Sequence, residues 1–287
     1  MPEGNPGLIR LGQFQLDIIS DGSFWLDGGA MFGVIPRTFW EKVSPPDERN
    51  RIHLKMNSLL IRSGEYTILV DTGCGDKFDE KFARIYGIQR EERIESELEK
   101  VGVRPSDIDI VINTHLHVDH CGGNTVRRDG RDHPAFPKAR YVVRRGEYDD
   151  ANAPNERNRA SYLPENWRPL EQSGQLEWID SDGPIVPGVS VVETPGHTRC
   201  HQSVRIDSDG SVAFFLADLV PTIHHLKVPW VMGYDLYPVT TMETKKKVLS
   251  RAQAERWLLM FQHEPDHPIG WLRGADGKSE FVPWEKQ

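Results

Sequence analysis

The sequence predicts an α/β protein with mixed sheets, and three patterns of apolar residues support this fold class. The chain begins with alternating apolar and polar residues, which are typical of half-buried antiparallel strands. Apolar residues at helical spacing follow, so strands and helices alternate. Four later apolar runs are short and continuous, as in the buried strands of layered α/β folds. We therefore expect one α/β domain.

The first predicted elements are a strand, a hairpin and a helix. Apolar and polar residues alternate over 14–18, which predicts a half-buried strand. Residues 58–61 and 67–70 flank a Ser-Gly-Glu turn and predict a hairpin. Apolar residues recur at helical spacing over 94–101, and Gly102 ends this predicted helix.

The four later apolar runs share a feature that bears on function: each leads into a residue that can bind a metal. The runs cover 108–112, 189–192, 212–217 and 257–261, and the residues that follow them are His115, His197, Asp218 and His263. In layered α/β folds, ligands gather in loops beyond one end of the strands. We therefore expect the four strand ends to converge on one site.

Two regions interrupt this pattern within a single expected domain over 1–287. An N-terminal arm at about 20–50 is partly apolar around Met31 and Phe32. The arm either covers the site or packs against a second subunit, so a homodimer is one of two open possibilities. The second region, at about 145–175, is polar without a clear period and predicts an inserted loop and helical region.

Composition excludes several classes of protein. The chain is 38% hydrophobic and 27% charged with a net charge of -8, which is typical of a globular protein and lacks the basic stripe that nucleic-acid binding requires. No stretch approaches eighteen apolar residues, and the N-terminus has no signal-peptide pattern. Three cysteines cannot all pair with one another. We expect a cytoplasmic protein with a small-molecule substrate and neither a nucleic-acid nor a membrane partner.

The segment 114–123 reads THLHVDHCGG and contains the pattern H-x-H-x-D-H. A shuffled chain of this composition would contain the pattern roughly once in a thousand cases. A single histidine would most often be an exposed polar residue, but three histidines and an aspartate after a buried strand would be costly to desolvate without a metal. The candidate ligands are His115, His117, Asp119 and His120.

These four side chains are too many for one catalytic metal that keeps an open coordination position. Two adjacent divalent ions explain the surplus. Imidazole and carboxylate groups suit zinc, which we expect, and also manganese, iron or cobalt.

The motif and the residues around it resemble the metallo-β-lactamase superfamily. The resemblance includes Asp71-Thr72-Gly73, the motif itself, Gly196-His197, Ala217-Asp218 and His263. It implies a four-layer αβ/βα sandwich of two mixed sheets, covered by helices, with the site along one edge.

The resemblance also implies roles for individual residues. It assigns His115, His117 and His197 to one metal, Asp119, His120 and His263 to the other, and Asp218 to both. Asp119 and Asp218 are then the catalytic carboxylates, with Asp119 passing a proton to the leaving group. Asp71 is expected to orient a metal-binding histidine, or the loop that carries it, without binding the metal itself. The alternative is that Asp71 is an ordinary turn residue. The implied reaction is hydrolysis by a water that two metals share.

Three further segments, 27–33, 218–222 and 228–235, are similar to the quorum-quenching lactonase-like branch of the superfamily, near the methyl-parathion-hydrolase type. This similarity implies a lactonase with side activity on phosphotriesters or aryl esters. One departure is Pro221, which stands where the best-known members of that branch have a tyrosine. A glyoxalase II-like thioesterase, which shares all seven ligands, is the alternative enzyme. A non-catalytic protein that keeps metal for stability is the third possibility.

A substrate pocket is expected from apolar and aromatic side chains near these segments, because small-molecule sites are mostly apolar. The candidates are Phe24, Trp25, Met31, Phe32, His225, Trp230 and Tyr234. For Phe24, Trp25, Met31, Phe32 and Trp230 the alternative is a contact in the core or between subunits. For His225 the alternative is a plain role in a loop.

Overall fold

The computed structural model describes residues 8–275 and 278–285. The chain divides into two compact units. Unit 1 comprises residues 1–22, 56–85 and 89–181, and unit 2 comprises 23–55, 86–88 and 182–287. The expectation of a single domain stays a prediction.

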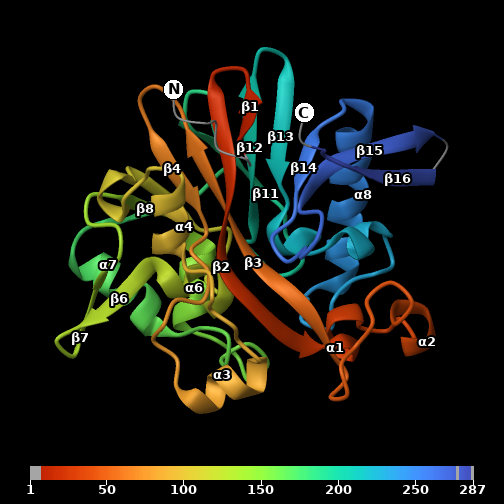
Figure 1. Ribbon diagram of the computed structural model, residues 1–287, viewed down its shortest axis with the longest axis horizontal. Helices are drawn as coiled ribbons and strands as arrows, with labels where there is room; N and C mark the ends of the chain where they lie inside the picture. Colours follow the sequence, from red (N-terminus) through yellow and green to blue (C-terminus); the bar gives the residue numbers. More distant parts are fainter. Residues whose placement is uncertain (1–7, 276–277, 286–287) are drawn as a thin grey trace. The chain divides into compact units, whose positions relative to one another are not determined.

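Unit 1 contains most of a seven-stranded mixed sheet (Figure 1). In spatial order its strands are β1 (Ile9–Leu11), β2 (Phe14–Asp27), β3 (Arg51–Arg62), β4 (Thr67–Val70), β5 (Ile110–Ile112), β8 (Arg140–Arg144) and β9 (Leu176–Ile179). β3 and β4 form the predicted antiparallel hairpin, and β4, β5, β8 and β9 run parallel. β5 is a continuous apolar run that is buried throughout, and β4 is apolar and buried after its half-buried first residue, Thr67, as strands covered on both faces require.

The helices of unit 1 lie mainly in the connections between its parallel strands. They are α3 (Glu80–Tyr86), α4 (Ile94–Lys100), α5 (Val118–Cys121), α6 (Arg145–Asn152) and α7 (Arg168–Gln172), with short 3-10 turns η1 (Pro105–Asp107), η2 (Gly122–Asn124) and η3 (Pro164–Asn166). β6 (Thr125–Arg128) and β7 (Arg131–Pro134) form a separate hairpin. α4 confirms the helix predicted over 94–101, although Val101 caps the helix rather than continuing it.

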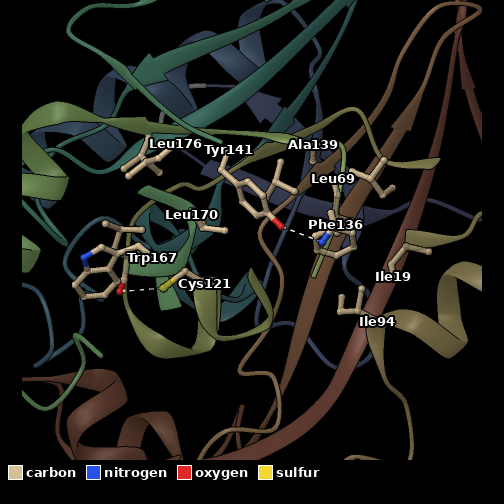
Figure 2. Close-up of a cluster of buried hydrophobic side chains, with 14 of the residues drawn as sticks. Ile19, Leu69, Ile94, Cys121, Phe136, Ala139, Tyr141, Trp167, Leu170 and Leu176 are labelled. Carbon is tan, nitrogen blue, oxygen red and sulfur yellow. Dashed lines mark hydrogen bonds between the residues drawn. The ribbon is translucent and has the colours of Figure 1, made fainter. Parts of the chain in front are cut away.

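The core of unit 1 joins the sheet to these helices. Figure 2 shows Ile94 of α4, Leu69 of β4 and Tyr141 of β8 in one buried cluster. The Tyr141 hydroxyl accepts a hydrogen bond from the Phe136 amide (3.0 Å), so the one polar group of that side chain is satisfied in the interior. Trp167 belongs to the same cluster, so the polar region at 145–175 contributes a core side chain to this unit.

Unit 2 contains a second seven-stranded sheet. Its strands are β10 (Gly183–Val186), β11 (Val189–Glu193), β12 (Gln202–Ser208), β13 (Ser211–Phe215), β14 (Leu258–Met260), β15 (Ile269–Ala275) and β16 (Lys278–Pro283). Every neighbouring pair is antiparallel except β13 and β14, which are parallel and connected through a helix. Together with β5, strands β11, β13 and β14 confirm that the four apolar runs are strands.

The helices of unit 2 are α1 (Gly28–Phe32), α2 (Arg37–Trp40) and α8 (Pro238–Ala254), with 3-10 turns η4 (Ala217–Leu219) and η5 (Ile223–Leu226). In α8 the residues Thr241, Lys245, Leu249 and Ala252 are buried, and their spacing of three to four places them on one face of the helix. Within the described residues, no helix combines the length and the apolar character that crossing a bilayer would require.

Candidate metal centre

The H-x-H-x-D-H residues of unit 1 lie just beyond the end of β5, in a loop and the single turn of α5. Nε2 of His115 and Nδ1 of His117 are 3.1 Å apart. Nε2 of His120 lies 3.6 Å from a carboxylate oxygen of Asp119. These four residues, the unit-1 ligand group, thus form an imidazole pair and an imidazole–carboxylate pair.

Asp71 is the partner that orients part of this group. It is fully buried, and its carboxylate accepts hydrogen bonds from the Thr114 amide (2.8 Å), the Thr114 hydroxyl (2.7 Å) and His120 Nδ1 (3.1 Å). Because a carboxylate only accepts, His120 donates through Nδ1, and Nε2 is the ring nitrogen left for a metal. Asp71 has a φ of 56°, a left-handed backbone conformation that is uncommon outside glycine.

In unit 2, Asp218 lies between two imidazoles, in the turn η4 that follows β13. Its Oδ2 is 3.1 Å from His197 Nε2, and its Oδ1 is 3.0 Å from His263 Nε2. All three side chains are buried. Asp218, His197 and His263 form the unit-2 ligand group, in which one carboxylate presents an oxygen to each of two histidines.

The loop that carries His197 depends on a glycine. Gly196 has a φ of 142°, and a Cβ there would lie 2.5 Å from backbone atoms of Thr241 in α8. The carbonyls of Gly196 and His197 accept hydrogen bonds from the amides of Tyr237 and Leu236. The loop is therefore seated directly on the start of α8.

Oxygen atoms also hold the outer ring nitrogens of the unit-2 histidines. His197 Nδ1 donates to Asp235 Oδ1 (3.0 Å), and His263 Nδ1 donates to the Lys55 carbonyl (2.8 Å). A third buried histidine, His201, accepts from the Asp218 amide through Nε2 (3.2 Å). The sequence analysis did not identify Asp235, Lys55 or His201 as supports, and the only available signal was the similarity of 228–235 to lactonase-like proteins.

The residues present fit divalent metal ions. A histidine that binds a metal usually donates its other ring nitrogen to an oxygen. Four candidate histidines do so: His115 to the Thr114 hydroxyl, His120 to Asp71, His197 to Asp235 and His263 to the Lys55 carbonyl. The remaining nitrogens, together with carboxylate oxygens, are the ligand types of zinc and its neighbours.

Several predicted pocket residues gather in the interior of unit 2. Phe32 stacks on His225 with ring centroids 4.8 Å apart, and Trp230 meets the edge of Phe32 at 5.5 Å. His225 donates through Nε2 to the Met31 carbonyl (2.8 Å), and its Nδ1 accepts from the Thr222 hydroxyl (2.8 Å). Burial lowers the pKa of His225 to about 3, so this imidazole is neutral at physiological pH. It joins the arm to the segment after Asp218.

Three other predicted pocket residues have different surroundings. Phe24 meets the ring of His263 edge-on at 5.2 Å, and Trp25 packs on His53 at 5.1 Å. Tyr234 is 39% exposed. Pro221, at the position of the expected tyrosine, accepts the His263 amide through its carbonyl (3.0 Å) and so supports a candidate ligand.

Two of the three cysteines are poorly suited to act as nucleophiles. Cys74, Cys121 and Cys200 are free and buried. Burial raises the pKa of the Cys74 and Cys121 thiols well above the ordinary value, so both stay protonated.

Comparison with known proteins identifies the family. Residues 54–263 match the model of the metallo-beta-lactamase superfamily. An N-acyl homoserine lactonase of Bacillus cereus is 32% identical over 234 residues, which cover 77% of this chain and 86% of that protein. A second relative, the N-acyl homoserine lactonase AttM of Rhizobium radiobacter, is 27% identical over 59% of this chain and 63% of its own.

Solved structures agree with this match. A probable metal-dependent hydrolase from Staphylococcus aureus superposes with a TM-score of 0.89 at 29% identity, covering 97% of this chain and all of the other. An N-acyl homoserine lactone hydrolase with N-hexanoyl-L-homoserine bound at its catalytic metal centre has a TM-score of 0.66 at 26% identity over 87% and 92% of the two chains. The dizinc quorum-quenching lactonase AidC shares the fold at 21% identity, with a TM-score of 0.80 and coverage of 99% of both chains. This chain therefore belongs to the metallo-beta-lactamase superfamily, has its α/β fold and is a metal-dependent hydrolase.

Proposed function

We propose that the protein is a dinuclear metal-dependent lactonase. The observation that supports this most directly is the position of Asp218 between two imidazoles whose outer nitrogens are already held by oxygen atoms. A carboxylate with one oxygen toward each histidine suits a ligand shared by two cations. The similarity to N-acyl homoserine lactonases at about 30% identity supports the choice of lactones as substrates.

In this proposal the two ligand groups form one centre. His115, His117 and His197 would hold one ion, Asp119, His120 and His263 would hold the other, and Asp218 would be a ligand of both. The pairing of His115 with His117 and of Asp119 with His120 within unit 1 supports this division. We propose zinc as the metal, since nitrogen ligands predominate.

Two divalent ions at such a centre supply a water of lowered pKa and polarise the carbonyl under attack. The protein residues have separate tasks. Asp218 contributes negative charge between His197 and His263. This charge would offset the positive charge of the two metal ions in a buried site. Asp119 has 24% of its side chain exposed, whereas the motif histidines are buried. It is therefore the group we assign to carry a proton.

The reaction opens the ring of the lactone. A water oxygen forms the new bond to the carbonyl carbon, and the bond from that carbon to the ring oxygen breaks. Asp119 takes the proton that the water loses and passes it to the departing alkoxide. The product is a hydroxy acid, and no oxidant or further reactant is needed.

The test is a comparison of kcat/KM on four neutral or anionic substrates with metal-loaded protein. The panel contains N-hexanoyl homoserine lactone, a glutathione thioester, an aryl phosphotriester and a β-lactam. We expect the lactone to be preferred, because a glutathione site would need cationic groups for its carboxylates. A thioester or phosphotriester preferred more than about tenfold over every lactone, equivalent to about 1.4 kcal/mol, would overturn the proposal.

Metal dependence is checked in the same experiment. Elemental analysis of loaded protein should give two ions per chain, and removal by a chelator should abolish turnover until metal is restored. A maximum of one ion would contradict the dinuclear assignment.

A further inference from the structure

The unit-1 ligand group depends on the loop 71–75, which follows β4. Asp71 in this loop orients His120 and Thr114, as described above. The next residue, Thr72, donates its amide to the His120 carbonyl (2.7 Å). A Cβ on Gly123 would lie 2.2 Å from the Thr72 carbonyl oxygen, so the loop and the segment after α5 are in direct backbone contact. A shift of this loop would therefore move His120.

The loop itself lies on Asp21 of β2. Asp21 is fully buried, and its Oδ2 accepts the Gly75 amide (3.0 Å). Gly73 has a φ of 67°, and a Cβ there would lie 2.2 Å from the Asp21 Cβ. Only a glycine allows this approach, so loop and carboxylate are packed without an intervening side chain.

The second carboxylate oxygen of Asp21 accepts two further hydrogen bonds. Oδ1 accepts from Arg90 Nη2 (2.5 Å) and from the amide of Ile94, the first residue of α4 (3.3 Å). A Cβ on Gly22 would lie 2.2 Å from the Gln89 carbonyl oxygen, which brings the strand backbone against the segment that carries Arg90. One buried carboxylate therefore connects β2, the start of α4 and the loop 71–75.

We propose that the Asp21–Arg90 ion pair is a positioning device for the metal-binding residues of unit 1. It holds the loop 71–75, through which Asp71 fixes the ring of His120 and the backbone before His115. Neither Asp21 nor Arg90 touches a candidate ligand in any contact described above. The inference rests on the proposed assignment of Asp119 and His120 as ligands.

The same strand provides a matched control. Asp17 is also buried on β2, and it pairs with Arg62 of β3 at 2.7 Å. Because residues two apart share a face of a strand, Asp17 and Asp21 lie on the same face. A general loss of stability from breaking a buried pair should appear in both Asp17→Asn and Asp21→Asn. A loss of metal positioning should appear only in Asp21→Asn.

The experiment titrates metal-free protein with zinc against a competing chelator. We expect Asp21→Asn to weaken the more loosely held ion by about tenfold, the lower end of the range for residues that contact metal ligands directly, because Asp21 acts through Asp71. Asp17→Asn should stay within about twofold of wild type. In the metal-free state, hydrogen exchange over 111–121 should quicken in Asp21→Asn and not in Asp17→Asn. Equal zinc affinities in the two variants would overturn the proposal.

A second pair of variants serves if Asp21→Asn does not fold. Arg90→Lys keeps the charge and Arg90→Gln removes it, so Lys should retain zinc affinity better than Gln. Wild-type affinity in Arg90→Gln would overturn the proposal. Zinc-loaded wild type that hydrolyses no lactone would refute only the proposed substrate. Wild type that binds no zinc would refute the metal assignment and this inference together.

Discussion

The two ligand groups are built in opposite ways. The unit-1 group takes four side chains from six consecutive residues, 115–120, and one carboxylate, Asp71, orients part of it. The unit-2 group takes three side chains from positions spread between 197 and 263, each with its own support. A compact motif depends on one loop, whereas a dispersed group depends on several strand ends that must each be placed correctly.

The largest expected effect comes from removing the charge at the centre of the dispersed group. Asp218→Asn keeps the shape of the side chain but removes the negative charge between His197 and His263. We expect kcat/KM to fall by about a thousandfold and the second ion to dissociate readily. Lactone turnover and metal content of the same preparation measure both effects.

Asp207→Asn is the control for that variant, because Asp207 lies on β12 of the same unit, is 46% exposed and pairs with Arg205. It should behave as wild type. Full turnover and occupancy in Asp218→Asn would mean that another residue bridges the ions.

The next effect compares the orienting carboxylates of the two groups. Asp71 accepts hydrogen bonds from His120 and from the amide and hydroxyl of Thr114, so it holds both a ligand and the backbone before His115, whereas Asp235 accepts from His197 and from the Met232 amide. Asp71→Asn should therefore lower zinc affinity by about a hundredfold and Asp235→Asn by about tenfold. Competition titrations measure both, and the reverse order would show that support is not concentrated on Asp71.

A smaller effect concerns acid stability in unit 2. The pKa of His225 is lowered from 6.5 to about 3 by burial, so the unfolded chain takes up a proton that the folded chain refuses. The stability that depends on neutral His225 is present above pH 6.5 and is lost as pH falls toward 3. Between pH 7 and pH 5 the loss should be about 2 kcal/mol.

Denaturant unfolding of metal-free protein at the two pH values measures this loss. His225→Gln cannot titrate and should lose correspondingly less stability over the same interval. An identical pH dependence in wild type and His225→Gln would contradict the prediction.

The smallest effect has the opposite sign and belongs to unit 1. Burial raises the pKa of Asp21 from 3.8 to about 6, and Arg90 offsets only part of this shift. The folded chain then holds this proton more tightly than the unfolded chain. Stability from the protonated form is complete below pH 3.8 and is lost as pH rises through 6. Between pH 5 and pH 7 the loss should be about 1 kcal/mol.

The difference between wild type and Asp21→Asn in unfolding free energy, followed from pH 5 to pH 7, isolates this contribution. His225 stabilises the folded chain more at higher pH, and Asp21 stabilises it more at lower pH. The unfolding free energy of wild type should therefore change less with pH than that of Asp21→Asn. A difference that does not change with pH would show that Asp21 has an ordinary pKa.

The sequence was informative where chemistry and spacing coincide. The α/β class and the four strands that lead into candidate ligands could be predicted, because apolar runs and turn residues follow local rules. The motif around His117 was recognisable because its ligands are neighbours in sequence. Asp71 was expected as an orienting residue, but the supports of the unit-2 group were not recognisable in the same way. Asp235 lies 38 residues from His197, and the support of His263 is a backbone carbonyl, which no residue type encodes.

His225 illustrates a second limit. Its place near the predicted bridge suggested a pocket residue, but both ring nitrogens are engaged within unit 2, by Met31 and by Thr222. Whether a polar residue faces a substrate or satisfies a buried backbone group depends on packing between distant segments, here the arm and the turn after Asp218. Asp21 was overlooked for the same reason, since Arg90 reaches it from 69 residues away.

The contact between Gly196 and Thr241 has a practical consequence for recombining this enzyme with its relatives. Since the loop before His197 has no room for even a methyl group above the first turn of α8, the two segments constitute one exchangeable block. A chimera that takes residues 194–201 from another family member without 235–241 would pack two mismatched segments against each other beside the candidate ligand His197. Crossover points for gene shuffling are better placed in β11, before this block, and late in α8, after it, so that both segments come from the same parent.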